Sequence, residues 1–286
     1  GSPGRVPVLK SKPLPEISRA DVRAVLDHAK GKVATRPNLF AVLRRLFRWA
    51  IREGDLGRSP LEGMEPPPLP TSPDRVLADW ELRLVFEAAG REEGPFAPLI
   101  RMLVLTGQRL EELAGARWEE LDRDEAVLHI PAARAKNRRA TDVPLSKSVI
   151  AELDRLVGEK WPRKGLVFTT TGKTPISGFA RTKRRLDRRM AEIATEEKEE
   201  RPLERWRYHD LRRTFATGMQ RLDVRFEVTE ALLNHVGSAR SGVAGVYQRH
   251  DWKAEKRLAV DAWASHVRAL IDSAEPSNLV PLRRPA

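Results

Sequence analysis

A proline-rich stretch divides this chain into a short first part and a longer second part. Residues 64–75 read Met-Glu-Pro-Pro-Pro-Leu-Pro-Thr-Ser-Pro-Asp-Arg. Proline has no backbone N–H to donate and favours extended backbone, so no helix is expected to cross this stretch. The sequence therefore predicts a small domain at residues 1–65, a linker at 66–75, a large domain at 76–267 and a C-terminal tail at 268–286.

The first part has the apolar spacing of two helices. Ser18 can cap the first helix, whose apolar residues are Val22, Val25 and Leu26. The second helix has an apolar stripe of Leu39, Leu43, Leu46, Phe47 and Ala50, and its other face carries Arg44, Arg45, Arg48 and Arg52. This arginine face is either solvated or DNA-facing. Two helices make a thin domain, so we expect the natural protein to begin further upstream.

The second part mixes helices with a little β structure. Its patterns predict helices over residues 79–89, 96–106 and from about 110 to 118, and again from about 178 to the end. Residues 127–130 and 141–145 read as two short β segments around a turn at 135–139, and Pro144 suits the end or the edge of a strand. The expected fold is thus mainly α with a small antiparallel β-sheet.

The charge of the chain points to an anionic partner. Its 52 Lys and Arg outnumber 40 Asp and Glu, which gives a net charge of +12 and a pI near 10.3. Nucleic acid is the simplest such partner, because each phosphate contact releases condensed counterions. A basic protein without a polyanion partner is the alternative. The absence of cysteine excludes disulfides and cysteine nucleophiles and suits a reducing cytoplasm. No apolar run approaches the ~18 residues of a membrane span.

A second basic stretch lies at residues 181–189. The apolar residues of this predicted helix are Phe179, Leu186, Met190 and Ile193, and its basic residues are Arg181, Lys183, Arg184, Arg185, Arg188 and Arg189. Such a helix could lie against a DNA groove, or its charges could be solvated.

Four separated segments carry the residues of chemical interest. They are Thr106-Gly107-Gln108-Arg109-Leu110-Glu111-Glu112-Leu113, Lys136 in the β turn, His209-Asp210-Leu211-Arg212, and Leu233-Asn234-His235 followed by Tyr247. Each signal is weak alone, since a lone His-x-x-Arg can satisfy a helix end and a lone tyrosine usually packs. The order and spacing of Arg109, Lys136, His209, Arg212, His235 and Tyr247 together are specific.

In these segments the chain resembles the catalytic domain of the tyrosine recombinase (phage integrase) family, most closely prophage and genomic-island integrases. The resemblance covers residues 75–265, and Asn234 stands where the family usually has glycine. Residues 16–63 resemble the second half of the helical core-binding domain of the family. The resemblance thus implies a recombinase catalytic domain preceded by a partial core-binding domain; the N-terminal arm-binding domain common in such integrases is not in this chain.

The residue types also fit phosphoryl chemistry by themselves. The transition state at a phosphodiester gathers negative charge, and two arginines can each offer a planar fork to its oxygens. A phenol with a pKa of ~10 must lose its proton before it attacks, and the departing 5′ oxygen must gain one. The arginines take the role of a cation, so we expect neither a metal nor another cofactor.

The resemblance implies a role for each residue. Tyr247 attacks the phosphate and becomes linked to the 3′ end, Arg109 and Arg212 clamp the phosphate, and Lys136 acts as general acid from a turn that moves. His209 helps to move the tyrosine proton and His235 donates a hydrogen bond to the phosphate. Three further residues have supporting roles: Glu112 orients the arginines, Asp210 caps or braces a helix, and Tyr208 is structural.

The expected function is therefore that of a site-specific DNA recombinase that integrates or excises a mobile element in the bacterial cytoplasm, at the nucleoid. Its expected partners are double-stranded attachment sites, three further copies in a tetramer, and accessory DNA-bending or directionality proteins. Candidate DNA contacts are Arg44, Arg45, Arg48, Arg181, Arg184 and Arg185. The tail at 268–286 either reaches a neighbouring protomer or is unstructured. The alternatives are an inactive DNA-binding protein of the same fold, a relaxing topoisomerase and a metal nuclease.

Overall fold

The computed structural model describes residues 12–29, 35–69, 75–235 and 250–272. The chain divides into two compact units, Gly1–Pro73 and Asp74–Ala286. Each unit has a hydrophobic core of its own. The boundary between the two units, after Pro73, thus falls near the end of the proline-rich stretch at residues 64–75.

The first unit is built on two helices, α1 (Arg19–His28) and α2 (Thr35–Arg52), after a short 3₁₀ turn, η2 (Leu14–Glu16). The Ser18 hydroxyl accepts a hydrogen bond from the backbone N–H of Asp21 at 3.3 Å, so the predicted cap is confirmed. Phe40, Leu43 and Phe47 of α2 are buried. Leu46, which the predicted apolar stripe included, is 37% exposed, because it lies beside the buried face of α2 and not on it.

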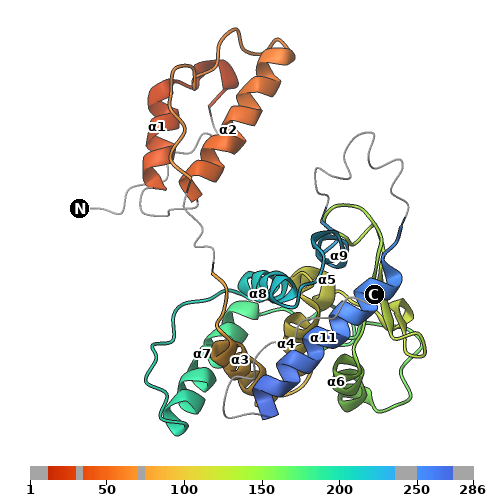
Figure 1. Cartoon of the computed structure of the whole chain (residues 1–286). Coiled ribbons are helices and arrows are strands. Elements are labelled where there is room, and N and C mark those ends of the chain that lie inside the picture. Colours follow the sequence, from red (N-terminus) through yellow and green to blue (C-terminus); the bar gives the residue numbers. More distant parts are fainter. Residues whose placement is uncertain (1–11, 30–34, 70–74, 236–249, 273–286) are drawn as a thin grey trace. The chain divides into compact units, whose positions relative to one another are not determined.

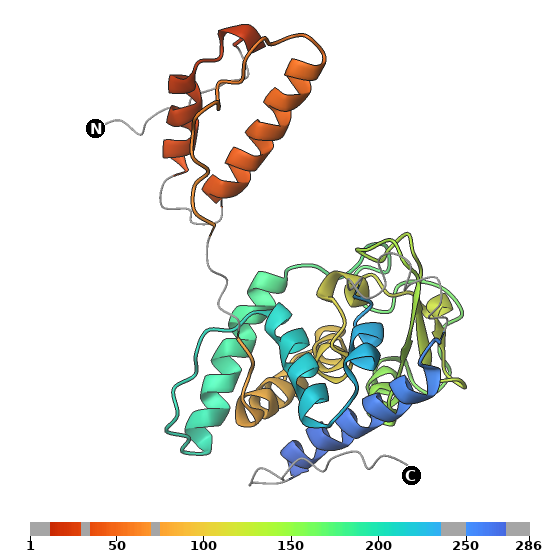
Figure 2. The same ribbon diagram turned by 45° about the horizontal axis from the view of Figure 1, so that its top comes forward.

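The second unit is mainly helical and is arranged around α4 (Phe96–Thr106). Eight residues of α4 are buried, and this helix packs against α3 (Asp79–Gly90), α6 (Lys147–Val157), α8 (Tyr208–Arg221) and α11 (Lys253–Asp272), as Figures 1 and 2 show. Among the described residues the unit also contains α5 (Leu110–Ala114), η3 (Trp118–Glu120), α7 (Phe179–Glu196) and α9 (Phe226–Leu232). The long helix α7 covers α3, and α11 also contacts α8 and α9.

A three-stranded antiparallel sheet lies beside this bundle. Its order is β1 (Leu121–Asp122), β2 (Val127–Ile130) and β3 (Thr141–Pro144), with Val127 opposite Pro144 and Ile130 opposite Thr141. Pro144 closes the edge strand β3, as predicted. The fold confirms the expectation of a mainly helical protein with a small antiparallel sheet. Strand β1 was not predicted, because two residues are too short to show a period.

The prediction of one helix from residue 110 to 118 is wrong. Helix α5 ends at Ala114, and the next residues pair with a distant segment instead. The backbone N–H of Trp118 donates to the Gly165 carbonyl at 2.8 Å, and that of Val167 donates to Ala116 at 2.9 Å. This long-range pairing takes the backbone groups that a continued helix would use.

The last helix of the second unit extends beyond residue 267, where the sequence predicted the large domain to end and a tail to begin. Helix α11 continues to Asp272, and its Val267 and Leu270 are buried in the core of the second unit. Residues 273–286 lie outside the described residues, so neither expectation for the tail is tested.

Candidate active site

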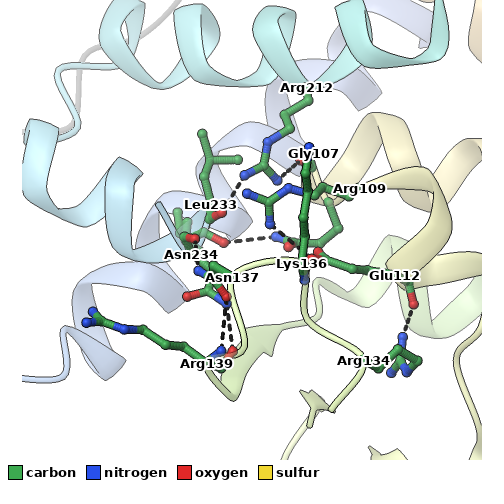
Figure 3. Close-up of polar contacts among 12 residues, drawn as sticks. Gly107, Arg109, Glu112, Arg134, Lys136, Asn137, Arg139, Arg212, Leu233 and Asn234 are labelled. Atoms are coloured by element: carbon green, nitrogen blue, oxygen red, sulfur yellow. Dashed lines mark hydrogen bonds and ion pairs between the residues drawn. The ribbon is translucent and has the colours of Figure 1, made fainter. Parts of the chain in front are cut away.

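The connection between α4 and α5 places Arg109 at the edge of the core. Helix α4 ends at Gly107, which has a φ of 61°, and Arg109 is the N-cap of α5. A Cβ on Gly107 would lie 2.5 Å from the Phe215 ring, so both the left-handed backbone and the close packing require glycine. The resulting sharp turn directs Arg109 to a site that Arg212 approaches from α8 (Figure 3).

Arg212 is held by two backbone carbonyls from different parts of the chain. Its guanidinium donates to the Gly107 carbonyl at 2.9 Å and also to the Leu233 carbonyl after α9. The residue is only 4% exposed. Burial, and then the positive charge of Arg109, lower the pKa of Arg212 to about 10, so it remains charged at neutral pH. The charge is thus fixed in place and shares its surroundings with a second guanidinium.

Glu112 connects Arg109 to the turn that carries Lys136. Its Oε1 accepts a hydrogen bond from Arg109 at 3.0 Å and another from the Lys136 backbone N–H at 3.0 Å. Glu112 is 3% exposed, and a buried carboxylate of this kind requires such partners. The Arg134 side chain donates to the Glu112 backbone carbonyl and also forms an ion pair with Glu120. One carboxylate therefore sets the distance between an arginine and a lysine that the sequence places 27 residues apart.

His209 lies at the start of α8, one turn before Arg212. Partial desolvation, and then the positive charges of Arg213 and Arg212, lower the pKa of His209, and the Lys136 charge acts in the same direction. The imidazole is consequently neutral at pH 7 and can accept a proton. Asp210 accepts a hydrogen bond from the Arg207 backbone N–H at 2.7 Å, which confirms its predicted role at the helix start.

His235 lies shortly after the end of α9, two residues beyond Leu233, whose carbonyl Arg212 binds. Its Nδ1 is 2.8 Å from Glu230 Oε1, which leaves Nε2 on the other side of the ring. The negative charge of Glu230 acts on Arg212, so His235 and its carboxylate partner belong to the same site. The structure thus brings together Arg109, Lys136, His209, Arg212 and His235.

The two tyrosines differ in how much the structure says about them. Tyr247, the predicted nucleophile, lies outside the described residues. Tyr208 is packed against Phe179 and Trp206, with ring centroids 6.3 and 5.9 Å away, and its hydroxyl donates to the Phe179 carbonyl at 3.4 Å. Burial raises the pKa of Tyr208, which opposes formation of a phenolate. These contacts agree with the structural role expected of Tyr208.

Several residues of the site were not singled out from the sequence. The Gln108 side-chain amide donates to the Leu232 carbonyl at 2.9 Å and so ties the α4–α5 turn to the end of α9. Asn137 and Asn234 join the Lys136 turn to the same place. Gln108 and Asn234 lie within the quoted motifs, but nothing local in the sequence indicates that their side chains reach across the fold.

The candidate DNA contacts fall into two groups. On α2, Arg45 and Arg48 are exposed and Arg44 stacks over the Phe40 ring at 4.8 Å. On α7, Arg181 and Arg184 are exposed, whereas Arg185 forms an ion pair at 2.7 Å with Glu92, a carboxylate that is 2% exposed. Arg185 therefore has a structural partner already, and the other arginines present their charge to solvent.

The site as a whole is suited to bind an anion between its arginines. Two guanidinium groups, a lysine and two histidines converge, and planar arginine forks match phosphate oxygens. Within the described ranges no group of three or more His, Asp or Glu side chains is placed to hold a metal ion. In the same ranges no helix is both long and apolar enough to cross a bilayer.

Comparisons with known proteins show the family to which the chain belongs. The phage integrase family model matches residues 84–251. The chain is 26% identical to the prophage integrase IntZ of Escherichia coli K12 over 93% of this chain, although it spans only 63% of the length of IntZ. It is 25% identical to the tyrosine recombinase XerC of Pseudomonas entomophila L48, over 83% of this chain and 73% of XerC.

Solved structures share the fold at low sequence identity. A lambda integrase tetramer bound to a Holliday junction matches with a TM-score of 0.60 and 19% identity, over 78% of this chain and 66% of that chain. The Tn1549 transposon integrase in complex with circular intermediate DNA matches with a TM-score of 0.56 and 16% identity, over 87% of each chain. Because the family model spans more than half of its residues, this chain belongs to the phage integrase family.

Proposed function

We propose that this chain is a site-specific DNA recombinase, an integrase that cleaves and rejoins DNA through a 3′-phosphotyrosyl intermediate. The observation that carries the proposal is the convergence of Arg109, Arg212 and Lys136 around the buried carboxylate of Glu112. Burying two like charges together is costly, and a dianionic transition state is a ligand that offsets this cost. Preorganised guanidinium groups need no rearrangement when negative charge develops.

The proposed reaction uses each group once. The Tyr247 oxygen forms a bond to phosphorus while the bond from phosphorus to the 5′ oxygen breaks. The phenol proton passes to neutral His209, and the Lys136 ammonium gives a proton to the departing 5′ oxygen. Arg109 and Arg212 bind the non-bridging oxygens. In the proposed step His235 carries a proton on each ring nitrogen, so that Nδ1–H donates to Glu230 and Nε2–H donates to a non-bridging oxygen. Attack by a 5′ hydroxyl from another duplex reverses these steps and joins new partners without ATP or a metal.

The proposed partners follow from the charge and from the relatives. We propose double-stranded attachment sites as the substrate, bound by a tetramer of this chain in the bacterial cytoplasm, where it acts on nucleoid DNA. A related lambda integrase was solved as a tetramer on a Holliday junction. Accessory DNA-bending or directionality proteins complete the proposed assembly. The prophage integrase relatives favour integration and excision of a mobile element as the outcome.

We also propose that the first unit is part of a core-binding domain. Its helix α2 has an arginine face, and a basic helix can contact phosphates across a groove. The second unit supplies the chemistry. On this division, DNA affinity comes from both units and strand cleavage from the second alone.

A nicked suicide substrate tests the proposed function directly. The nick lets the 5′-hydroxyl fragment diffuse away, so the covalent protein–DNA adduct accumulates and is seen on a denaturing gel. Tyr247→Phe should abolish the adduct while DNA binding persists, because only the attacking hydroxyl is removed. Tyr208→Phe is the matched control and should leave adduct formation intact.

Each competing function predicts a different result in this assay. A binding protein without activity gives a mobility shift and no adduct with the unchanged chain. A relaxing topoisomerase removes supercoils from an arbitrary plasmid, which a site-specific recombinase leaves supercoiled. A metal nuclease loses activity in EDTA. An adduct that survives Tyr247→Phe would show that Tyr247 is not the nucleophile.

A further inference from the structure

Two asparagines that are 97 residues apart in the sequence meet beside Lys136. Asn137 lies in the turn between β2 and β3, and Asn234 lies between α9 and His235. The Asn137 amide donates to the Asn234 carbonyl at 2.6 Å. In return the Asn234 amide donates to the Arg139 carbonyl at 2.9 Å and to Asn137 Oδ1 at 3.3 Å. Figure 3 shows both side chains between the turn and the end of α9. We call this reciprocal pair the asparagine latch.

The backbone at Asn234 does not by itself explain the asparagine. Its φ of 47° is in the left-handed region, which glycine adopts most easily and asparagine tolerates. Glycine would therefore satisfy the backbone at lower cost. What asparagine adds is its side-chain amide, which has two acceptors in the turn. The side chain thus has a function beyond permitting the positive φ.

The latch holds one side of the Lys136 turn, and Glu112 holds the other. The Lys136 backbone N–H donates to Glu112, and the latch begins at the next residue, Asn137. Asn137 Oδ1 also accepts the Arg139 backbone N–H at 3.1 Å, which shapes the turn internally. Ala135 is buried in the core before Lys136, but residues 138–140 are exposed and Arg138 has a φ of 56°, so packing contributes little to the part of the turn after Lys136. Hydrogen bonds on both sides of the turn therefore fix the position of the Lys136 backbone.

We propose that Asn137 and Asn234 are positioning residues that hold the Lys136 ammonium at the departing 5′ oxygen. This inference rests on the proposed function, in which Lys136 gives its proton to that oxygen as the bond to phosphorus breaks. A lysine side chain has four rotatable bonds, so its productive position is rare unless the backbone below it is fixed. The latch also joins the lysine turn to the segment that carries His235 and the carbonyl partner of Arg212. The latch therefore fixes the position of Lys136, the proposed proton donor, relative to the residues that bind the phosphate.

Two variants each break a different half of the latch while keeping the backbone. Asn234→Gly keeps the positive φ and removes both side-chain bonds. Asn137→Asp keeps Oδ1, which shapes the turn, and removes the amide that binds the Asn234 carbonyl. Thr171→Ala is the matched control, because it removes side-chain bonds from an exposed turn elsewhere in the same unit. Thermal melting of all three variants shows whether each is folded.

The measurement compares two leaving groups in single-turnover cleavage at saturating DNA. One substrate has the natural 5′ oxygen at the scissile phosphate and the other has a bridging 5′ sulfur. A thiolate is stable near neutral pH, with thiol pKa values around 8.5, and so leaves without a proton donor. We expect each latch variant to cleave the oxygen substrate about tenfold more slowly than the unchanged chain, from the loss of one or two hydrogen bonds. On the sulfur substrate the rates should be equal.

The outcomes separate this inference from the proposed function. If the unchanged chain forms no adduct on either substrate, the proposed function fails. If it forms the adduct and the folded latch variants cleave the oxygen substrate at the same rate, the latch does not position Lys136. An equal slowing of latch variants on both substrates would overturn the inference as well, because it would place the defect in the phosphate clamp or in the fold. Thr171→Ala should behave as the unchanged chain on both.

Discussion

Arg212 and Arg48 carry the same guanidinium group, but the fold treats them in opposite ways. Arg212 is 4% exposed and donates to two backbone carbonyls from segments far apart in the sequence. Arg48 lies on the exposed face of α2, beside Arg44, Arg45 and Arg52, which with it line a shallow hollow. Its charge is solvated and its side chain can adjust. The comparison teaches that arginine content alone does not distinguish a buried, preorganised site from a solvated basic face.

The difference has a physical consequence for what each region can do. A solvated arginine binds phosphate by releasing counterions and tolerates several positions of the backbone. A buried arginine held by fixed hydrogen bonds can stabilise the charge of the transition state more than that of the ground state. This difference is what accelerates a reaction. We therefore expect substitutions at the buried site to change rates and substitutions on α2 to change affinity.

The largest effect should come from replacing the buried arginine. Arg212→Lys keeps the charge but cannot bind both the Gly107 and the Leu233 carbonyls and still present a fork to the phosphate. We expect single-turnover cleavage to slow by roughly 100-fold or more, as when a preorganised donor is removed. Arg48→Lys is the control and should cleave saturating DNA at the normal rate. If both substitutions have equally small effects, the two regions do not differ as described.

A second contrast lies within α7, where neighbouring arginines have different surroundings. Arg185→Ala removes one partner of the buried Glu92 carboxylate and leaves Arg189 as the other. We expect it to lower the free energy of unfolding by about 1–3 kcal/mol, the usual cost of an unsatisfied buried charge partner. Arg184→Ala, one residue away and exposed, should leave stability unchanged and weaken DNA binding. Urea denaturation of both variants measures the difference, and equal stabilities would contradict it.

The arginine face of α2 should determine part of the salt dependence of DNA binding. Arg45→Ala and Arg48→Ala together should weaken DNA binding and reduce the slope of log affinity against log salt by about 0.9 for each phosphate that the protein no longer neutralises. Affinity measured at several salt concentrations gives this slope. The cleavage rate at saturating DNA should stay the same. A slope equal to that of the unchanged chain would remove α2 from the interface.

The smallest effect should be that of pH on the cleavage rate. His209 must be neutral to accept the phenol proton, and its pKa lies below the usual histidine value. Activity is then fully present above that pKa and falls as the pH drops through it. Between pH 7.5 and 6 we expect the cleavage rate to decrease by at most about fourfold, since the ordinary pKa is about 6.5. His209→Gln should be slow and lack this dependence, whereas the double α2 variant should retain it.

The sequence indicated the chemistry better than the contacts that organise it. Arg109, Arg212 and Lys136 were found because their types and order form a recognisable series, and the mainly helical fold with a small sheet is confirmed. The Asn137–Asn234 pair was not found, because a contact across 97 residues leaves no local period. The end of α5 at Ala114 was missed for the same reason, since pairing with residues 165–167 overrides helix propensity there. The catalytic roles of all six residues, with Tyr247 as the nucleophile, stay predictions.

The two carbonyls that Arg212 binds have a consequence for when the proposed strand cleavage could occur. They lie after α4 and after α9, so the guanidinium is aligned only when three separate helices have packed together. A copy that is partly unfolded would keep its positive charge and still adhere to DNA. It would lack the aligned guanidinium, and a strand would not be cut. On the proposed function, the ability to cleave DNA would thus depend on the completed tertiary structure of the second unit.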